Sequence, residues 1–417
     1  MSRELSTGVE QGTEAQRFSK WDWLVLPALS LATILFIAGS IYLIDKCFFS
    51  EAQDPHSRCL AFDRWNEPVG IPNSVCWIKG AEMRRPVEYR FNSCGHRTAG
   101  ECRTKPPGVY RIVLIGSSTG MGFTVPVEST FAALLPAELS RQTGRKVEVY
   151  NEAIIEKRPQ AIVSGFDEVL GAHPDLILWA LTPSDVEYDT QNSGKPFAGP
   201  PGLFPQVRWR IRQELATKPA WRVALDTVDI LRVAFHDSHL AFPIQHYLDK
   251  SQSEYVRLIL MGDRSAGYLR SNQDAFWQAA LRHLDAEMAR MGEEASAAHV
   301  PFSVALFPDS FQAAMISMGS WPRGYDPYNL DKEVQTIVTR HGGIYLDILP
   351  GMRDIPNPEQ DYLPIDGHPD ARAHAIFTSL IAQQLTSGAI PALSAGIRQS
   401  ATVRGDEKGS APEAAAR

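Results

Sequence analysis

The sequence predicts an α/β fold: a doubly wound, five-stranded parallel sheet with a helical insertion, preceded by one N-terminal transmembrane helix. Three observations predict it. Short, nearly continuous apolar runs recur along the chain, as in strands that are covered on both faces. Helical patterns separate these runs, in the strand, helix, strand order of right-handed crossovers. One longer apolar segment near the N-terminus has the length of a membrane span.

Five apolar runs are the candidate strands of the sheet. Helical patterns at 131–143 and 331–340 fall between successive runs. The gap before the fourth strand is about 120 residues long, too long for one crossover helix. We expect a helical insertion there, at about 188–300, which either covers the carboxyl ends of the strands or only packs on the domain. The strands are expected at 111–115, 147–150, 176–181, 302–307 and 344–349.

The apolar segment 23–44 carries no charged residue and is long enough for a hydrocarbon core. A cleaved signal peptide is the alternative, but its apolar part is roughly 7 to 15 residues long. We therefore expect an uncleaved, single-pass membrane anchor. Arg17 and Lys20 precede it and favour residues 1–22 in the cytoplasm, with the large domain in the periplasm or outside the cell.

A lead-in segment, residues 45–108, contains all five cysteines of the chain. Four of them are able to pair in an oxidising compartment, in three connectivities that the sequence leaves open, and free thiols are the alternative. The α/β domain is expected over 109–390, and residues 391–417 have the low hydrophobicity of a disordered tail. The four cysteines are Cys59, Cys76, Cys94 and Cys102.

Composition argues against several classes of partner. The net charge of −7 provides no basic footprint for nucleic acid, so we expect none to bind. No group of Cys, His and acidic residues has convincing metal-ligand spacing. We therefore expect neither a metal ion nor a cofactor. Asp185 and Glu187 are interpreted as solvated residues, because a glycosidase needs two converging carboxylates.

The first predicted strand runs into a turn of small residues, Gly-Ser-Ser-Thr-Gly-Met-Gly at 116–122. A serine hydroxyl in such a turn is presented at the sheet edge, where backbone N–H groups face a developing oxyanion. The glycine spacing differs from the dinucleotide-binding fingerprint, and no Gly-Lys-Ser/Thr of a P-loop follows. By itself the turn also suits phosphate binding or a purely structural role.

A second motif, Asp366-Gly367-His368-Pro369, lies just before the last helical pattern. In a loop, this spacing lets the carboxylate orient the imidazole, whose other nitrogen then takes a hydroxyl proton. Such a turn is more often a surface feature. Its place at the same edge of the sheet as the serine turn favours a catalytic role for both.

Over roughly residues 87–388 the chain resembles the SGNH (GDSL-type) hydrolases. Gly116-Ser117-Ser118 stands where the family has Gly-Asp-Ser, and Asn151 matches a frequent asparagine. The resemblance implies a flavodoxin-like SGNH fold, with Ser118 as nucleophile, His368 as base and Asp366 as its orienting partner. Further matches are Glu88-Tyr89-Arg90-Phe91-Asn92-Ser93, Gly108-Val109-Tyr110-Arg111-Ile112 and Pro174-Asp175-Leu176-Ile177-Leu178.

The chain departs from the family at its oxyanion donors. Ser117 replaces the aspartate before the nucleophile, Glu156 falls near the expected glycine, and Ser184 takes the place of the expected asparagine. We expect these last two and Gly116 to border the oxyanion site, with Glu156 acting through its backbone N–H. One missing donor costs about 3 kcal/mol of transition-state stabilisation. The Asp-x-His spacing, in place of Asp-x-x-His, is that of acyltransferase-type members.

These observations predict a membrane-tethered serine hydrolase outside the cytoplasm that cleaves an acyl ester, with a cell-envelope glycan or lipid as substrate. Two alternatives remain. A periplasmic O-acyltransferase of the same fold would transfer the acyl group to a sugar hydroxyl. In both enzymatic alternatives the substrate is an acylated small molecule or glycan. A catalytically silent protein would bind a glycan or act as a scaffold, because fold does not certify activity.

Overall fold

The computed structural model describes residues 22–48, 59–63, 67–79, 83, 85–98, 102, 105–191, 251–262, 265–363 and 366–394. The chain divides into two compact units, residues 1–50 and 51–417, each described here by itself. Most of the predicted N-terminal tail, much of the predicted insertion (192–250) and the chain beyond residue 394 lie outside the described residues.

The first unit contains one helix, α1 (Asp22–Phe48), over the segment predicted as a membrane anchor. Its large apolar side chains are exposed along the helix, with Phe36 75% exposed and Leu29 and Leu35 each 62% exposed. No helix in the described part of the chain combines the length and the apolar character that a membrane crossing requires.

The second unit is built on a five-stranded parallel sheet in the order β6-β5-β7-β8-β9. By position along the chain this is the order 2-1-3-4-5 of flavodoxin-like folds. β5 and β7 are buried at every residue, which explains the continuous apolar sequence of β7 and, apart from Arg111, that of β5. Arg111 is buried in β5 as an ion pair with Glu148. The strands are β5 (Tyr110–Gly116), β6 (Val147–Asn151), β7 (Leu176–Leu181), β8 (Phe302–Leu306) and β9 (Ile344–Tyr345).

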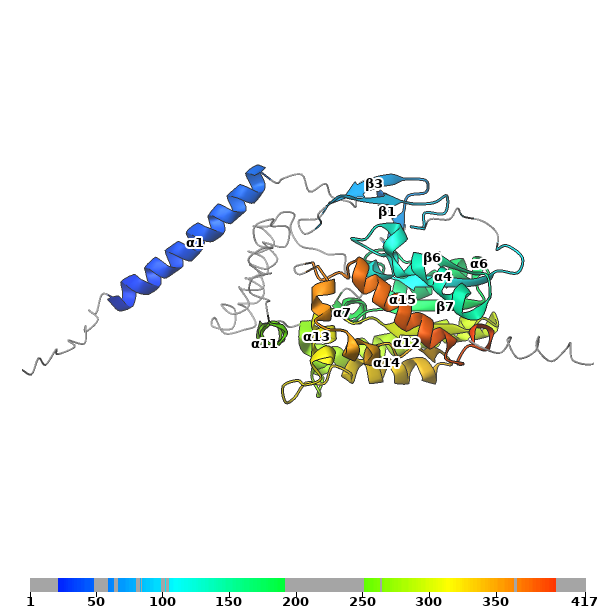
Figure 1. The fold of residues 1–417 in the computed structure, drawn as a ribbon. Helices are drawn as coiled ribbons and strands as arrows, with labels where there is room; N and C mark the ends of the chain where they lie inside the picture. The colour runs from blue at the N-terminus through cyan, green and yellow to red at the C-terminus, as the bar shows by residue number, and fades with distance from the viewer. Residues whose placement is uncertain are drawn as a thin grey trace, which may run out of the picture. The chain divides into compact units, whose positions relative to one another are not determined.

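Two helical layers cover the sheet (Figure 1). α4 (Phe131–Thr143) and α15 (Ala371–Thr386) pack on each other, and α12 (Ala275–Ala297) packs on α5 (Pro159–Ser164) and α14 (Asn329–Arg340). The chain reverses its direction across the sheet after β6, and right-handed crossovers then place α4 and α5 on opposite faces. The doubly wound, five-stranded fold is confirmed.

Other helices connect or flank these elements. They are α3 (Ser118–Met121), α6 (Phe166–Gly171), α7 (Pro183–Gln191), α11 (Gln252–Gly262), α13 (Ser310–Met318) and the 3-10 helices η1 (Val127–Ser129), η2 (Ser265–Leu269), η3 (Leu349–Asp354), η4 (Pro358–Asp361) and η5 (Pro391–Leu393).

Two predicted boundaries are wrong. The last strand was predicted over 344–349, but β9 ends at Tyr345. It is an edge strand paired only with β8, and after one more bond, from Leu346 N to Val304 O, the chain turns into η3. The disordered tail was predicted from residue 391, but η5 occupies the first residues there and buries Leu393 completely.

The lead-in segment forms two antiparallel strand pairs that the sequence pattern did not reveal. β1 (Leu60–Phe62) pairs with β2 (Pro68–Gly70), and β3 (Val75–Ile78) pairs with β4 (Val87–Arg90). These strands are only three or four residues long, too short for a reliable alternation pattern. Their buried side chains join Met121 of α3 and residues 153–155 in a second hydrophobic cluster.

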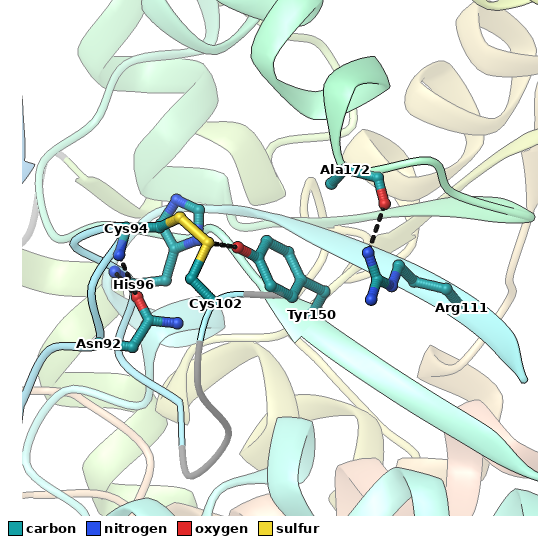
Figure 2. Close-up of a disulfide and its surroundings, with 7 residues drawn as sticks. All are labelled: Asn92, Cys94, His96, Cys102, Arg111, Tyr150 and Ala172. Atoms are coloured by element: carbon teal, nitrogen blue, oxygen red, sulfur yellow. Dashed lines mark hydrogen bonds between the residues drawn. A yellow bond between two sulfur atoms is a disulfide. The ribbon is translucent and has the colours of Figure 1, made fainter. Parts of the chain in front are cut away.

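Two disulfides tie this lead-in together, Cys59–Cys76 and Cys94–Cys102, one of the three predicted connectivities. The second disulfide lies against the sheet, with 3.2 Å between Cys102 Sγ and the hydroxyl of Tyr150 in β6 (Figure 2). The lead-in is therefore part of the folded unit and packs where β5 and β6 end.

Candidate active site

The serine turn begins where β5 ends, at the carboxyl edge of the sheet. Gly116 has a φ of +148°, and a Cβ there would lie 2.6 Å from the Ala180 carbonyl oxygen of β7, so only glycine fits. Ser117 is the N-cap of α3, and half-buried Ser118 is the first residue of that helix. The first N–H groups of a helix have no partner inside it, which leaves the Ser118 N–H available to an oxyanion.

Two buried side chains hold the backbone of the serine turn from below. Asn151 Nδ2 donates to Gly120 O at 3.0 Å, and its Oδ1 accepts from Ala153 N at 3.1 Å. Arg97, from the lead-in, donates to the carbonyl oxygens that follow: Met121 at 3.0 Å, Gly122 at 2.5 Å and Val125 at 2.6 Å.

The predicted acid–base pair forms within one loop. The His368 Nδ1 contacts Asp366 Oδ1, which also accepts the backbone N–H of His368 at 3.2 Å. The loop is closed by bonds from Leu363 N to His368 O and from Gly367 N to Leu363 O, both 2.8 Å. The side chains of His368 and Asp366 are 23% and 19% exposed, so solvent reaches the imidazole.

Phe123 links this loop to the serine turn. Its backbone N–H donates to Ser118 O at 2.9 Å, and its ring meets the His368 ring edge to face at a centroid distance of 4.8 Å. Among the described residues no hydrogen bond joins Ser118 to His368. The structure thus brings the two motifs to one edge of the sheet with the serine and the imidazole not yet hydrogen-bonded, an arrangement common in enzymes without substrate.

A second carboxylate, Asp185, belongs to the site although the sequence interpretation placed it in solvent, which is wrong. The side chain is 8% exposed and accepts bonds from Thr182 N and Thr182 Oγ1, both 2.8 Å, and from the Ser117 hydroxyl. Burial raises the pKa of Asp185, while the bonds from Ser117 and Thr182 and the positive charge of protonated His368 oppose that rise.

One sequence signal predicts a structural role for Asp185. Thr182-Pro183-Ser184-Asp185 is a Thr-x-x-Asp capping box, the reciprocal side-chain pattern at a helix start. The structure contains both halves of it, since Asp185 N also donates to Thr182 Oγ1 at 3.2 Å. Asp185 thereby caps the start of α7 and also holds Ser117, the residue before Ser118.

Ser184 and Glu156, the other residues predicted at the oxyanion site, are both exposed. Ser184 is exposed in the first turn of α7. Glu156 is exposed with a φ of +60°, the left-handed conformation that favours the glycine expected there. No contact of either side chain with Ser118 or His368 occurs in the described residues. Their roles as oxyanion donors stay predictions.

His374, one turn into α15, has a structural role. It is fully buried, stacks on Phe131 at 5.7 Å, and its Nδ1 accepts from Phe131 N at 3.2 Å. Burial lowers its pKa to about 3, with nearby positive charge from Arg97 adding to the effect. In the described ranges no three His, Cys, Asp or Glu side chains gather as metal ligands would.

No family model and no curated protein matches the chain. Solved structures similar to it include TesA, at 11% identity and a TM-score of 0.36, with 66% of this chain and 98% of that chain covered. A putative lipolytic protein of the G-D-S-L family from Desulfitobacterium hafniense DCB-2 is 13% identical at a TM-score of 0.33, with 66% and 99% covered.

A third similar structure is the psychrotrophic esterase EstA from Pseudoalteromonas sp., 8% identical at a TM-score of 0.34, with 66% of this chain and 97% of that chain covered. The solved structures similar to this chain thus include proteins named as an esterase and as a member of the G-D-S-L family, the family that the sequence resembles.

Proposed function

We propose that the protein is a serine esterase with Ser118 as nucleophile, His368 as general base and Asp366 as the carboxylate that orients it. The contact between Asp366 and His368 Nδ1 carries this proposal. An ionised carboxylate at Nδ1 selects the tautomer with its proton on Nδ1, so Nε2 is the basic nitrogen. The loop that holds this pair packs against the serine turn through Phe123.

In the proposed reaction, Ser118 Oγ attacks the ester carbonyl while His368 Nε2 takes its proton. The Ser118 N–H donates to the oxyanion. The imidazolium then protonates the leaving alcohol, and water, activated by the same imidazole, releases the acid from the acyl-enzyme. Asp185, through Ser117, keeps the serine turn in place during both steps.

We place the reaction outside the cytoplasm. The two disulfides of the lead-in support this, because structural disulfides persist in oxidising compartments. The exposed apolar side chains of α1 support attachment to a membrane surface, since a large exposed apolar surface often marks a membrane contact. An enzyme held there meets the acylated glycans and lipids of the cell envelope, which we propose as its substrates.

The test is hydrolysis of short-chain nitrophenyl esters by the full chain in mild detergent, with Ser118→Ala and His368→Ala variants. Exposed residues of the same type provide matched controls, Ser164→Ala and His283→Ala. Activity lost in the first pair and kept in the second supports the proposal. A fluorophosphonate probe that fails to label Ser118, together with no hydrolysis, would instead indicate a silent binding protein.

Acyl transfer is distinguished in the same assay. With a sugar acceptor present, a transferase forms the acylated sugar at the expense of the free acid, whereas an esterase forms only the acid. Transfer that outpaces hydrolysis would reassign the protein as an O-acyltransferase using the same serine.

A further inference from the structure

The helix that begins with the proposed nucleophile is too short to be stable by itself. α3 spans only Ser118–Met121, and a single helical turn is unfavourable because it fixes several residues for very few hydrogen bonds. Contacts from outside the helix must therefore hold the Ser118 N–H in the direction of the oxyanion. Asn151 of β6 provides one such contact at Gly120 O, and Arg97 of the lead-in provides others at the end of the helix.

Arg97 binds the carbonyl oxygens at and beyond the C-terminal end of α3. The residue is 1% exposed, and a guanidinium stays charged in proteins. A cation at this end of a helix complements the negative pole of the helix dipole. Arg97 thus fixes the end of α3 opposite to the Ser118 N–H. Its two Nη atoms donate at 3.0 Å to Met121 O, at 2.5 Å to Gly122 O and at 2.6 Å to Val125 O.

The Cys94–Cys102 disulfide closes a ring that contains Arg97. The sequence separation of the two cysteines is 8, and such a closure restricts the conformations of every residue within it. The ring lies on Tyr150 of β6 (Figure 2): Cys102 Sγ is 3.2 Å from the tyrosine hydroxyl, and the His96 ring meets the tyrosine ring edge to face at 5.1 Å. The disulfide therefore helps to fix the segment from which Arg97 reaches α3.

The two disulfides of the lead-in differ in exposure. Cys94 is exposed and Cys102 is half-buried, whereas Cys59 is 1% and Cys76 5% exposed. Thiol–disulfide exchange requires that a thiolate reach one of the sulfur atoms. In the folded protein a dithiol reductant therefore has better access to the bridge beside Arg97 than to the buried bridge.

We propose that Arg97 is a positioning residue of the esterase reaction, and that the Cys94–Cys102 disulfide keeps it in place, so that reduction by a dithiol lowers the activity. The inference rests on the proposed function, in which the Ser118 N–H is an oxyanion donor. In the reduction, the disulfide takes up two electrons and two protons and becomes two thiols, while the dithiol becomes a disulfide. The opened ring no longer holds Arg97 against α3.

The size of the effect follows from the oxyanion donor that is disturbed. Removal of one such donor lowers kcat by about 10²–10³, so a donor that is only loosened should lower kcat by about tenfold or more. KM should change little, because the bond to the oxyanion is formed only in the transition state.

Ester hydrolysis by the full chain in mild detergent tests the role of Arg97. Arg97→Met should lower kcat by about tenfold or more, with KM within about threefold. Arg97→Lys keeps the charge but has fewer donors and should retain an intermediate kcat. Arg90→Met is the matched control in the same segment, because Arg90 is 65% exposed and pairs with Glu88; it should keep kcat within about twofold. A kcat of Arg97→Met within about twofold of the wild type would overturn the proposal.

Reduction by dithiothreitol then tests whether the disulfide acts through Arg97. Reduction should lower kcat by about tenfold in the wild type and in Arg90→Met, but by less than about twofold in Arg97→Met, where the positioning is already lost. Cys94→Ala/Cys102→Ala should have the low kcat without reductant, which keeps the proposal testable if Arg97→Met does not fold. Equal losses on reduction in the wild type and Arg97→Met, or full activity of the double cysteine variant, would overturn the proposal.

Hydrogen exchange separates this inference from the proposed function. Met121 N and Phe123 N donate to Ser117 O and Ser118 O, both at 2.9 Å, so their exchange reports the order of the serine turn directly. Reduction should speed their exchange by about tenfold or more. A wild type that hydrolyses no ester refutes the proposed function, and exchange then decides alone whether the disulfide and Arg97 hold the turn. Unchanged exchange after reduction of Cys94–Cys102 would overturn the inference.

Discussion

Replacement of Asp366 by asparagine is the sharpest test of the proposal that this carboxylate orients the catalytic His368. Asp366 accepts both the ring Nδ1–H and the backbone N–H of His368, and asparagine is nearly isosteric. The amide keeps an acceptor for the backbone but no longer selects the tautomer or stabilises the imidazolium. In serine hydrolases this kind of change lowers kcat by about 10⁴, equivalent to about 5 kcal/mol of barrier.

The same change should hardly affect stability. Both side chains of the pair are about one-fifth exposed, and a solvent-accessible pair contributes at most about 1 kcal/mol. In a domain of this size, that is a shift of about 2–4 °C or less in the melting temperature. A large loss of activity with an almost unchanged melting curve is the expected signature, measured by ester hydrolysis and by circular dichroism on the same sample.

Asp361 provides the matched control. It ends η4 just before that loop, is 2% exposed, and pairs with Arg372 at 3.2 Å instead of with the imidazole. Asp361→Asn should keep activity within a fewfold of the wild type. If Asp366→Asn loses less than about tenfold, or if Asp361→Asn loses as much as Asp366→Asn, the assignment of Asp366 as the orienting carboxylate is refuted.

Three further predictions concern stability, each measured by urea unfolding. Asn151→Ala removes two buried hydrogen bonds of about 1 kcal/mol each and should cost about 2 kcal/mol, whereas an unchanged midpoint would contradict the support role. Because the pKa of His374 is lowered to about 3, unfolding takes up a proton as the pH falls below about 6.5. Between pH 7 and 5 the free energy of unfolding should therefore fall by about 2 kcal/mol more in the wild type than in His374→Leu. Curves of unfolding free energy against pH that run parallel for the two proteins would refute this. The double substitution Cys59→Ala/Cys76→Ala opens a disulfide of sequence separation 17 and should cost about 3 kcal/mol, while alkylation of all four cysteines in the native chain without reductant would show that neither bridge forms.

The sequence by itself determined the fold class and the acid–base motif. A strand covered on both faces is mostly apolar, so β7 was predicted to the residue. The helical pattern between the first two strands likewise predicted α4 to the residue. The contact between Asp366 and His368 depends on local chemistry, since both side chains belong to one short loop.

The tertiary structure decided the features that depend on contacts between segments far apart in the sequence. The lead-in strands are too short to carry a pattern, and they are held by disulfides and by packing on α3, which no local signal specifies. Asp185 is a charged residue at a helix start, where solvent exposure is the usual state, yet it is buried and accepts a hydrogen bond from Ser117 at the end of another strand. Arg97 shows the same principle, because a guanidinium buried beneath the serine turn is defined only when segments remote in sequence meet.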